Sequence, residues 1–530
     1  MLVKALVLLA CARPVASVSV VVFLPGTTSY ERGPLEFIAQ QLARRNHKVC
    51  TFKGIIIPEQ KYLVAHSLMN VRAIQLKTGV AESVYGPIRA ASGAYPWLMN
   101  SYDVDNFESA RWRAYNASCE RLLNSDLMDK LKKGGHDVAL VYHENPCHLA
   151  IVHAVGMPFI LYDMSGFSDE TLVASSLSPM GLLQKATVIP SSKTTFAQPM
   201  STAQLLENAW SLFKELSPAL GIESVASYLS GRYRLMDLPI TNQFRHDYEL
   251  KKRFPGGSFP DVNEIKRRAE LFFVNSDPLL EFDGRAVESN VVYVGGAHMD
   301  DPKPLFDHWN ASMSSAEEGV IVCQLGTRVN QTAMPERVRE ALLDAFGALP
   351  KTRVYFHTGG WELPILDFKP NLEHLPPNIN LTSFVPQNDL LASKYTKVLI
   401  TNGGMMSIME AMVHGVPLLG IPLAGSDYHN LRKVEAKGFG IILDKQKVTA
   451  KTVHAALRQL LDNPKYKLAA KSMSRAYHSR PINALHTVLY WIEYVARNHG
   501  AKHLKPNRKL LELQGSALLC SAALCRQGGV

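Results

Sequence analysis

The amino-acid sequence predicts an α/β protein with two Rossmann-like domains that face a cleft. Its 530 residues are 47% hydrophobic and 20% charged, which is enough apolar material for more than one large core. Strand-like apolar runs alternate with amphipathic helical patterns, and this alternation favours parallel sheets covered on both faces. The alternation occurs in two separate series along the chain, which predicts two such sheets.

The first series begins with Val18–Leu24 (VSVVVFL), a run typical of a buried strand. A helix is predicted near Leu35–Arg45, and Pro34 suits its first turn. The apolar face of that helix consists of Leu35, Ile38 and Leu42.

The remainder of the N-terminal half is less regular. Val138–Tyr142 and Pro158–Tyr162 are predicted as further buried strands. From about residue 165 to residue 285 the chain is richer in helical patterns and in breaks such as Phe254–Pro260.

The second series starts after Val291–Gly296 (VVYVGG). Its predicted strands are Val320–Leu325, Arg353–His357, Val398–Thr401, Leu418–Ile421 and Phe439–Leu443. Its predicted helices lie around Glu336–Phe346 and Met405–Val413. We place the N-terminal domain at residues 18–285 and the C-terminal domain at residues 286–480.

The N-terminus resembles a secretory signal peptide over residues 1–17. Met1–Ala12 holds a single Lys and a short apolar run, and small residues then allow cleavage near Ala16 or Ser17. The alternative is that the run is a first buried strand. Four glycosylation sequons fit a lumenal chain, at Asn116, Asn310, Asn330 and Asn380.

Positive charge is concentrated at the C-terminal end. Residues 431–530 hold 18 Lys/Arg against 5 Asp/Glu, whereas residues 1–430 carry a net charge of −3. A nucleic-acid-binding protein is expected to show basic patches along its body, so we expect no nucleic-acid partner. The apolar run Ala517–Cys525 is shorter than the ~20 residues that cross a bilayer, which leaves membrane-surface association open.

Seven cysteines are scattered along the chain without zinc-type spacing. We expect at most one or two disulfides and no metal.

The segment Ser383–Asn430 contains the residues that we predict to bind a ligand. Strand Val398–Thr401 ends in Asn402-Gly403-Gly404 and a helix follows at once, so free N–H groups and the positive end of the helix dipole suit a phosphate or diphosphate. On that helix Ser407 and Glu410 share a face, where Ser407 suits a phosphate oxygen and Glu410 suits both hydroxyls of a ribose. The alternative is a simple Gly-Gly turn followed by a solvated Glu410.

Taken in order, these motifs resemble the signature of the UDP-glycosyltransferases, especially the animal UDP-glucuronosyltransferase family. The matching residues are Phe384-Val385-Pro386-Gln387, Leu390-Leu391, Thr401-Asn402-Gly403-Gly404, Ser407 to Glu410, Gly415-Val416-Pro417 and Pro422 to Asn430. Gln324-Leu325-Gly326-Thr327 is similar to the family's Ser-Leu-Gly-Ser loop, and Tyr477–Leu504 is similar to its closing helix. The chain is identified as a divergent member.

The resemblance implies the GT-B glycosyltransferase fold and metal-independent inversion, with a UDP-sugar as donor substrate and no cofactor. It implies transfer of a hexose or glucuronate to the hydroxyl of a small lipophilic acceptor, as in detoxification. It places a closing helix at residues 481–504 and leaves a basic and apolar tail at residues 505–530. The donor-binding residues that it implies are Thr327, Phe384, Gln387, Asn402, Gly403, Gly404, Ser407, Glu410, Ser426 and Asp427.

The donor site departs from the family pattern at three places. Phe384 replaces the Trp that stacks on uracil, and Asn402 replaces the His that faces the diphosphate. Ser426-Asp427 replaces the Asp-Gln pair that holds sugar hydroxyls, unless a one-residue shift leaves Asp427 as the acid and Tyr428 in place of Gln.

The catalytic base also departs from the pattern. Glu31 aligns with the family's catalytic His, and Tyr142 aligns with its supporting Asp. One hypothesis is an exchanged dyad in which Glu31 and either His143 or Glu144 share proton transfer. The alternative is that Glu31 is a loop residue paired with Arg32 and the base has been lost.

Three functions therefore stay open. The first is a UDP-glycosyltransferase of the endoplasmic reticulum lumen, membrane-associated or secreted, and the second is a weak or inactive relative that binds ligands or pairs in homo- or hetero-oligomers. The third is a cytosolic glycogen- or sterol-type transferase of the same fold.

Overall fold

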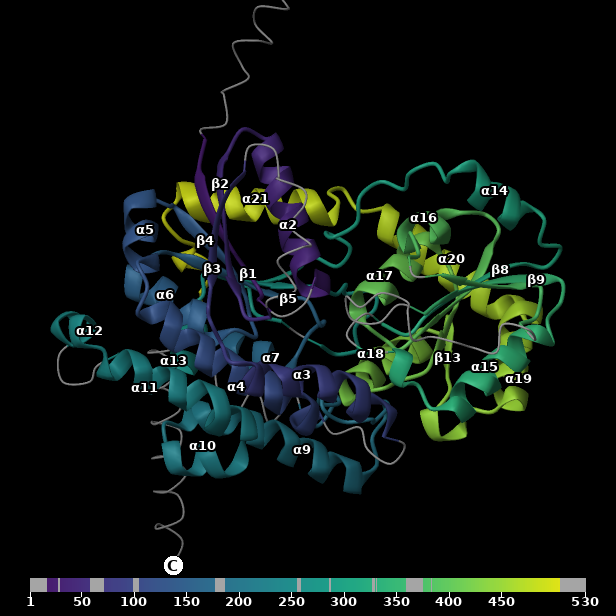
Figure 1. The fold of residues 1–530 in the computed structure, drawn as a ribbon, viewed down its shortest axis with the longest axis horizontal. Coiled ribbons are helices and arrows are strands. Elements are labelled where there is room, and N and C mark those ends of the chain that lie inside the picture. Colours follow the sequence, from purple (N-terminus) through teal and green to yellow (C-terminus); the bar gives the residue numbers. More distant parts are fainter. Residues whose placement is uncertain are drawn as a thin grey trace, which may run out of the picture.

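Seven strands of the N-terminal half form one parallel sheet in the order β3-β2-β1-β4-β5-β6-β7 (Figure 1). In this computed structural model the described residues are 17–26, 29–57, 71–98, 104–176, 186–254, 259–285, 287–326, 329, 331–358, 375–382 and 384–505. The strands are β1 (Ser19–Leu24), β2 (Lys48–Ile55), β3 (Val71–Lys77), β4 (Val138–Tyr142), β5 (Phe159–Asp163), β6 (Leu271–Val274) and β7 (Val291–Tyr293). The predicted signal peptide lies outside the described residues, apart from Ser17.

Both faces of this sheet are apolar because side chains alternate along each strand. In β1, Val20 and Val22 pack beneath α2, whereas Val21 and Phe23 pack toward α4 and α6. The helices of this lobe are α2 (Ser29–Arg44), α3 (Glu82–Ala94), α4 (Val104–Leu123), α5 (Leu127–Gly134), α6 (Pro146–Val155), α7 (Asp169–Ser175), α9 (Thr202–Leu216), α10 (Glu223–Leu229), α11 (Leu238–His246), α12 (Tyr248–Arg253) and α13 (Val262–Lys266).

Six strands of the C-terminal half form a second parallel sheet in the order β10-β9-β8-β11-β12-β13. Its strands are β8 (Gly319–Gln324), β9 (Thr352–His357), β10 (Ile379–Thr382), β11 (Thr396–Thr401), β12 (Leu418–Gly420) and β13 (Gly440–Ile442). The helices that follow β7 are α14 (Asp307–Ser314), α15 (Glu336–Gly347), α16 (Gln387–Ala392), α17 (Met405–His414), α18 (Gly425–Ala436), α19 (Ala450–Asp462), α20 (Pro464–His478) and α21 (Ala484–Arg497). The predicted α/β class with two Rossmann-like sheets is confirmed.

The structure corrects three details of the prediction. Pro34 lies inside α2 rather than in its first turn, because the helix already begins at Ser29. Strand β7 pairs with β6 and completes the first sheet, so the second lobe starts beyond the predicted boundary at residue 286. Strands β2, β3, β6 and β10 were not predicted; β3 lies at an edge with most side chains exposed or half-buried, which weakens its apolar signal.

The last helix joins the two lobes. α21 follows the C-terminal lobe in sequence but lies against α2 and β4 of the N-terminal lobe, where Val488, Leu489 and Ile492 are buried (Figure 1). The lobes are also joined by a buried ion pair, 2.9 Å between Lys433 Nζ on α18 and Glu281 Oε1 beyond β6. Within the described part of the chain, no helix combines the length and the apolar character needed to cross a membrane.

Candidate active site

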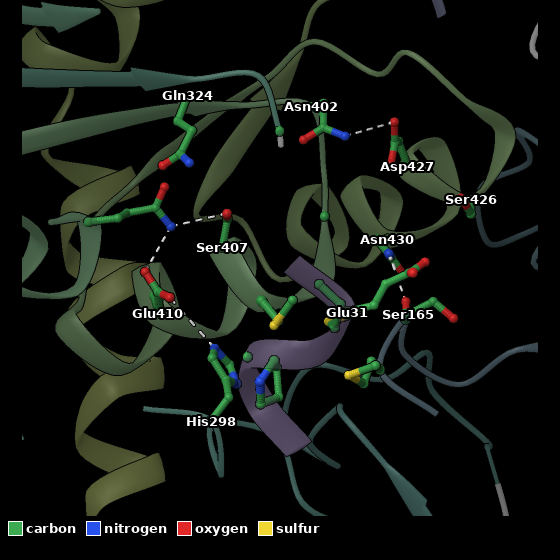
Figure 2. A pocket seen from close by; sticks show the side chains of 18 of the residues that line it. Glu31, Ser165, His298, Gln324, Asn402, Ser407, Glu410, Ser426, Asp427 and Asn430 are labelled. Atoms are coloured by element: carbon green, nitrogen blue, oxygen red, sulfur yellow. Dashed lines mark hydrogen bonds and ion pairs between the residues drawn. The ribbon is translucent and has the colours of Figure 1, made fainter. Parts of the chain in front are cut away.

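A cavity of about 340 Å³ lies between the lobes, beside residues that follow the carboxyl ends of β4, β5, β8 and β11 (Figure 2). This is the edge at which open parallel sheets bind ligands. The lining residues are Glu31, Gly33, Pro34, Tyr142, Met164, Ser165, His298, Gln324, Gly326, Val385, Gln387, Asn402, Gly404, Met405, Met406, Ser407, Glu410, Ser426, Asp427 and Asn430. The cavity thus has an N-terminal half around Glu31 and a C-terminal half around α17.

The N-terminus of α17 forms the floor of the C-terminal half. Gly404 is the N-cap and its helix receives no side-chain cap, so the first backbone N–H groups of α17 are not capped by a neighbouring side chain. Gly403 has φ 109°, and a Cβ there would lie 2.7 Å from the carbonyl oxygen of Asp427. Only glycine fits this turn, which brings α17 to the cavity by its backbone.

Ser407 and Glu410 point into the cavity from the first turns of α17 (Figure 2). Gln387 on α16 donates from Nε2 to Glu410 Oε2 at 2.7 Å and to Ser407 Oγ at 3.0 Å. Its own Oε1 is buried without a hydrogen-bond partner among the described residues, and so is Gln324 Oε1 at the end of β8. A buried acceptor without a donor costs free energy, so both atoms favour a ligand that carries hydrogen-bond donors.

Asn402 and Asp427 hold each other beside the α17 N-terminus. Asn402 Nδ2 donates to Asp427 Oδ2 at 3.1 Å, and the same oxygen accepts from the backbone N–H groups of Leu423 and Ala424 at 3.2 Å and 3.0 Å. Asp427 therefore closes the N-terminal turn of α18 and orients the Asn402 amide. One oxygen of the Asp427 carboxylate is therefore already hydrogen-bonded within the protein, although the resemblance implies that a carboxylate here holds sugar hydroxyls.

The other residues predicted to bind the UDP-sugar lie at the edge of the cavity or outside it. Phe384 is 69% exposed and is not among the cavity-lining residues, where its neighbour Val385 appears instead. Ser426 reaches the cavity near its edge (Figure 2). Thr327 lies outside the described residues.

The N-terminal half is organised around the Arg111 guanidinium on α4. Its Nη1 donates to Glu31 Oε1, its Nη2 lies 2.5 Å from Glu144 Oε2, and Nη2 also contacts Glu108 one helical turn away. The Tyr142 hydroxyl donates to the same Glu31 oxygen at 3.3 Å. We call Glu31, Glu108, Arg111, Tyr142 and Glu144 the Arg111 cluster.

Burial and charge act in opposite directions on this cluster. Burial alone would lower the pKa of the Arg111 guanidinium, but the carboxyls of Glu108, Glu144 and Glu31 together raise it well above its ordinary value. Burial raises the pKa of Tyr142 well above its usual range, and the Glu144 and Glu31 carboxyls raise it further. The phenol therefore stays protonated and remains a hydrogen-bond donor to Glu31.

His143 and Glu144 do not line the cavity. Side chains alternate at the end of β4, so Tyr142 faces the cavity and His143 turns behind it. There His143 Nδ1 lies 3.2 Å from the Tyr162 carbonyl oxygen and Nε2 lies 3.5 Å from Asp163 Oδ1. Burial lowers the pKa of His143, which keeps its imidazole neutral. Of the proposed dyad, the structure brings only Glu31 to the cavity, with Tyr142 rather than His143 beside it.

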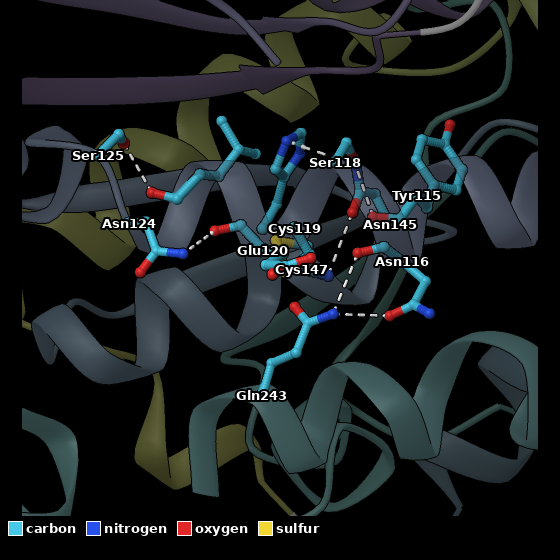
Figure 3. The surroundings of a disulfide bond; sticks show 12 residues. Tyr115, Asn116, Ser118, Cys119, Glu120, Asn124, Ser125, Asn145, Cys147 and Gln243 are labelled. Carbon is cyan, nitrogen blue, oxygen red and sulfur yellow. Dashed lines mark hydrogen bonds between the residues drawn. A yellow bond between two sulfur atoms is a disulfide. The ribbon is translucent and has the colours of Figure 1, made fainter. Parts of the chain in front are cut away.

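A disulfide joins the two segments that carry Arg111 and Glu144. Cys119 on α4 is bonded to Cys147 in the first turn of α6 (Figure 3), with Cα atoms 5.5 Å apart. α4 carries Arg111 and Glu108, and Glu144 precedes α6, so the crosslink joins the two segments whose charges meet at Glu31. Cys50 and Cys323 are buried free thiols, which keeps the described part of the chain within the expected one or two disulfides.

Two functional residues were not found from the sequence. Arg111 lies on the apolar face of α4 together with Tyr115 and Cys119, so a charged residue within an apolar helical stripe was the available signal. His298 follows β7 in the connection between the lobes, and its local sequence carries no comparable pattern.

The solved structures with a similar fold include glycosyltransferases. The glycotransferase of kitacinnamycin matches with a TM-score of 0.57 and 16% identity, covering 90% of this chain and 99% of that chain. The calicheamicin glycosyltransferase CalG4 matches with a TM-score of 0.55 and 16% identity, covering 91% of this chain and 99% of that one. The chain thus has the GT-B fold, with the cavity between its two lobes.

Sequence relatives narrow this fold class to one family. The family described as UDP-glucoronosyl and UDP-glucosyl transferase matches residues 257–516. UDP-glucuronosyltransferase 3A2 of Homo sapiens is 30% identical over 390 residues, which are 73% of this chain and 68% of the relative. UDP-glucuronosyltransferase 2C1 of Oryctolagus cuniculus is 27% identical over 481 residues, 89% of this chain and 88% of the relative. The chain belongs to the UDP-glucuronosyl and UDP-glucosyl transferase family, as a divergent member that takes a UDP-sugar donor.

The names of the relatives do not agree on one sugar. Besides the glucuronosyltransferases, 2-hydroxyacylsphingosine 1-beta-galactosyltransferase of Homo sapiens is 27% identical over 430 residues, 78% of this chain and 72% of the relative. Membership of the family therefore does not decide which sugar or which acceptor this chain uses.

Proposed function

We propose that this protein transfers a hexose or glucuronate from its UDP-sugar to the hydroxyl of a small lipophilic acceptor, with inversion and without a metal or cofactor. The observation that carries the proposal is the set of buried acceptors without donors, Gln324 Oε1 and Gln387 Oε1, beside the uncapped N-terminus of α17. The hydroxyl groups of a nucleotide diphosphate sugar can donate to the two glutamine oxygens, and its phosphate oxygens can accept from the N–H groups at the start of α17.

In the proposed complex, the N–H groups at the start of α17 and the Ser407 hydroxyl bind the diphosphate. Glu410, held by Gln387, accepts from ribose hydroxyls. Phe384 provides an exposed ring on which the uracil stacks. Asn402, fixed by Asp427, donates to the diphosphate as it leaves and so stabilises the charge that develops on it.

On the acceptor side we propose Glu31 as the general base. It removes the proton of the acceptor hydroxyl while the oxygen attacks the anomeric carbon and UDP departs. Tyr142 and Arg111 orient the carboxylate by holding its Oε1 atom.

A second candidate function is a weak or inactive relative that binds a UDP-sugar without turning it over. The Arg111 cluster favours this alternative, because the guanidinium and the Tyr142 hydroxyl already occupy lone pairs through which Glu31 would accept a proton. The donor half of the cavity is the same in both cases.

Turnover of the purified full chain separates the two functions. The protein is mixed with UDP-glucuronate, UDP-glucose or UDP-galactose and a panel of phenolic and aliphatic alcohols, and released UDP is measured. The enzyme releases UDP with at least one pair, and Glu31→Gln lowers its kcat by about 100-fold or more, since general bases contribute about 10²–10⁴. No release from any pair, together with a UDP-dependent rise in melting temperature, identifies the binding relative; equal kcat for wild type and Glu31→Gln removes Glu31 from catalysis.

We also propose passage through the secretory pathway into the endoplasmic reticulum lumen. The Cys119–Cys147 disulfide supports this, because disulfides persist in oxidising compartments. N-terminal sequencing of the protein from a eukaryotic host is expected to begin near Ser17, and an intact Met1 on the folded protein would contradict the proposal.

A further inference from the structure

His298 lies between the two lobes and lines the C-terminal half of the cavity (Figure 2). Its side chain is only 7% exposed, and neither ring nitrogen has a hydrogen-bond partner among the described residues. An imidazole always carries at least one N–H donor, so this buried group lacks an acceptor as well as a donor. Such a group favours a polar ligand.

The backbone holds His298 rigidly in this place. Gly295 donates its N–H to the Ser276 carbonyl oxygen at 2.9 Å, and its own carbonyl accepts from Tyr477 Oη on α20 at 2.9 Å. A Cβ at Gly295 would lie 2.7 Å from Met409 Cε, and a Cβ at Gly296 would lie 2.3 Å from Tyr477 Oη. The connection between the lobes is thus held by the turn after β6, by α17 and by α20, and it presents His298 to the cavity.

His298 and Glu410 lie close enough for one hydroxyl, placed to the side of the pair, to contact both. His298 Nε2 lies 3.6 Å from Glu410 Oε1, which is too long for a direct hydrogen bond. Gln387 occupies the other carboxylate oxygen, Glu410 Oε2, at 2.7 Å. A hydroxyl group can donate to Glu410 Oε1 and accept from a His298 N–H at the same time, which satisfies both side chains.

We propose that His298 donates a hydrogen bond to the ribose hydroxyl that Glu410 accepts from, and so selects a ribonucleotide donor over a deoxyribonucleotide donor. This inference rests on the proposed donor site. Because the ribose is remote from the anomeric carbon, the contact is the same in the ground state and the transition state. Loss of His298 is therefore expected to raise KM for the UDP-sugar and leave kcat nearly unchanged.

The test is the affinity of the full chain for UDP, 2′-deoxy-UDP and 3′-deoxy-UDP, measured by titration calorimetry on the wild type, His298→Ala and His298→Gln. His298→Ala is expected to weaken UDP binding by about tenfold, as the loss of one hydrogen bond to a buried group does. The preference for UDP over the deoxy analogue that lacks the bridged hydroxyl should shrink by the same factor. His298→Gln keeps an N–H donor and is expected to restore part of that preference.

The control variant is His308→Ala, an exposed histidine beyond the same connection, which is expected to bind all three nucleotides as the wild type does. If the wild type does not bind UDP, the proposed function fails before His298 is tested. If the wild type binds UDP but His298→Ala weakens all three nucleotides equally, or none of them, the donor site stands and the role of His298 is overturned.

Discussion

The two halves of the cavity differ in whether their buried polar atoms have partners within the protein. In the C-terminal half, Gln324, Gln387 and His298 keep buried polar atoms that no described residue satisfies. In the N-terminal half, Glu31 is held in the Arg111 cluster, where the two Nη atoms of Arg111 pair with carboxylates and only its Nε has no hydrogen-bond partner among the described residues of the cluster.

This difference indicates what each half requires. Unpaired buried polar atoms lower stability until a ligand pairs with them, so the donor half is arranged for binding. Charges that pair within the protein contribute little to ligand binding and make the protein sensitive to the loss of any partner. The donor half should therefore respond to mutation in affinity, and the acceptor half in stability.

Arg111→Met is expected to have the largest effect. It leaves the buried carboxyl groups of Glu31 and Glu108 and the half-buried one of Glu144 without their shared cation, which costs about 3–5 kcal/mol of unfolding free energy. Urea denaturation and the melting temperature measure the loss. Arg113→Met, at an exposed position of the same helix, is the matched control, and equal melting temperatures for the two variants would contradict the structural role of Arg111.

Removal of the disulfide by Cys119→Ala with Cys147→Ala is expected to come next. The crosslink spans 28 residues, and the chain-entropy argument gives about 3–4 kcal/mol for a loop of this length. The melting temperature should fall while the Kd for UDP stays the same, because the disulfide supports only the acceptor half. A parallel loss of UDP affinity would show that the two halves are not independent.

Glu410→Gln tests the donor half. Hydrogen bonds to a charged group contribute about 1.5–3 kcal/mol, so UDP affinity is expected to fall by about 10- to 100-fold with little change in melting temperature. Glu336→Gln, an exposed carboxylate at the start of α15, is the control. Unchanged UDP affinity in Glu410→Gln would exclude Glu410 from the ribose site.

Asn402→His is expected to have the smallest effect, in the favourable direction. It restores the family's histidine beside the α17 N-terminus, and a charged donor binds an anion more strongly than a neutral amide does. We expect the affinity for UDP at pH 6 to rise by about threefold to tenfold, equivalent to about 1 kcal/mol. Asn402→Ala should lower it, and an equal loss in both variants would show that the amide is needed for its bond to Asp427.

Much of the donor half could be predicted because it is local in sequence. β11, the Gly403 turn and α17 follow one another directly, and helical spacing alone brings Ser407 and Glu410 to one face. The structure places both side chains in the cavity, together with Gln387 and Asn402.

The acceptor half could not be predicted in the same way. Glu31 was found by its alignment with a family residue, but its partner Arg111 is 80 positions away and was not found. His143 and Glu144 were favoured over Tyr142, although the alternation of side chains at the end of β4 turns Tyr142 to the cavity. Contacts between two helices that are far apart in the sequence leave no pattern in the spacing of residues.

The sequence by itself determined the two parallel sheets, the uncapped helix at the carboxyl edge of the second sheet and the family of the chain. Periodicity and ordered motifs express these features because they depend on neighbouring residues. Only the tertiary structure decided that Arg111 holds Glu31, that a disulfide supports their contact and that His298 reaches Glu410 across the connection between the lobes. These contacts depend on the packing of distant segments, which brings together charges and unpaired polar atoms whose separation in the sequence carries no signal.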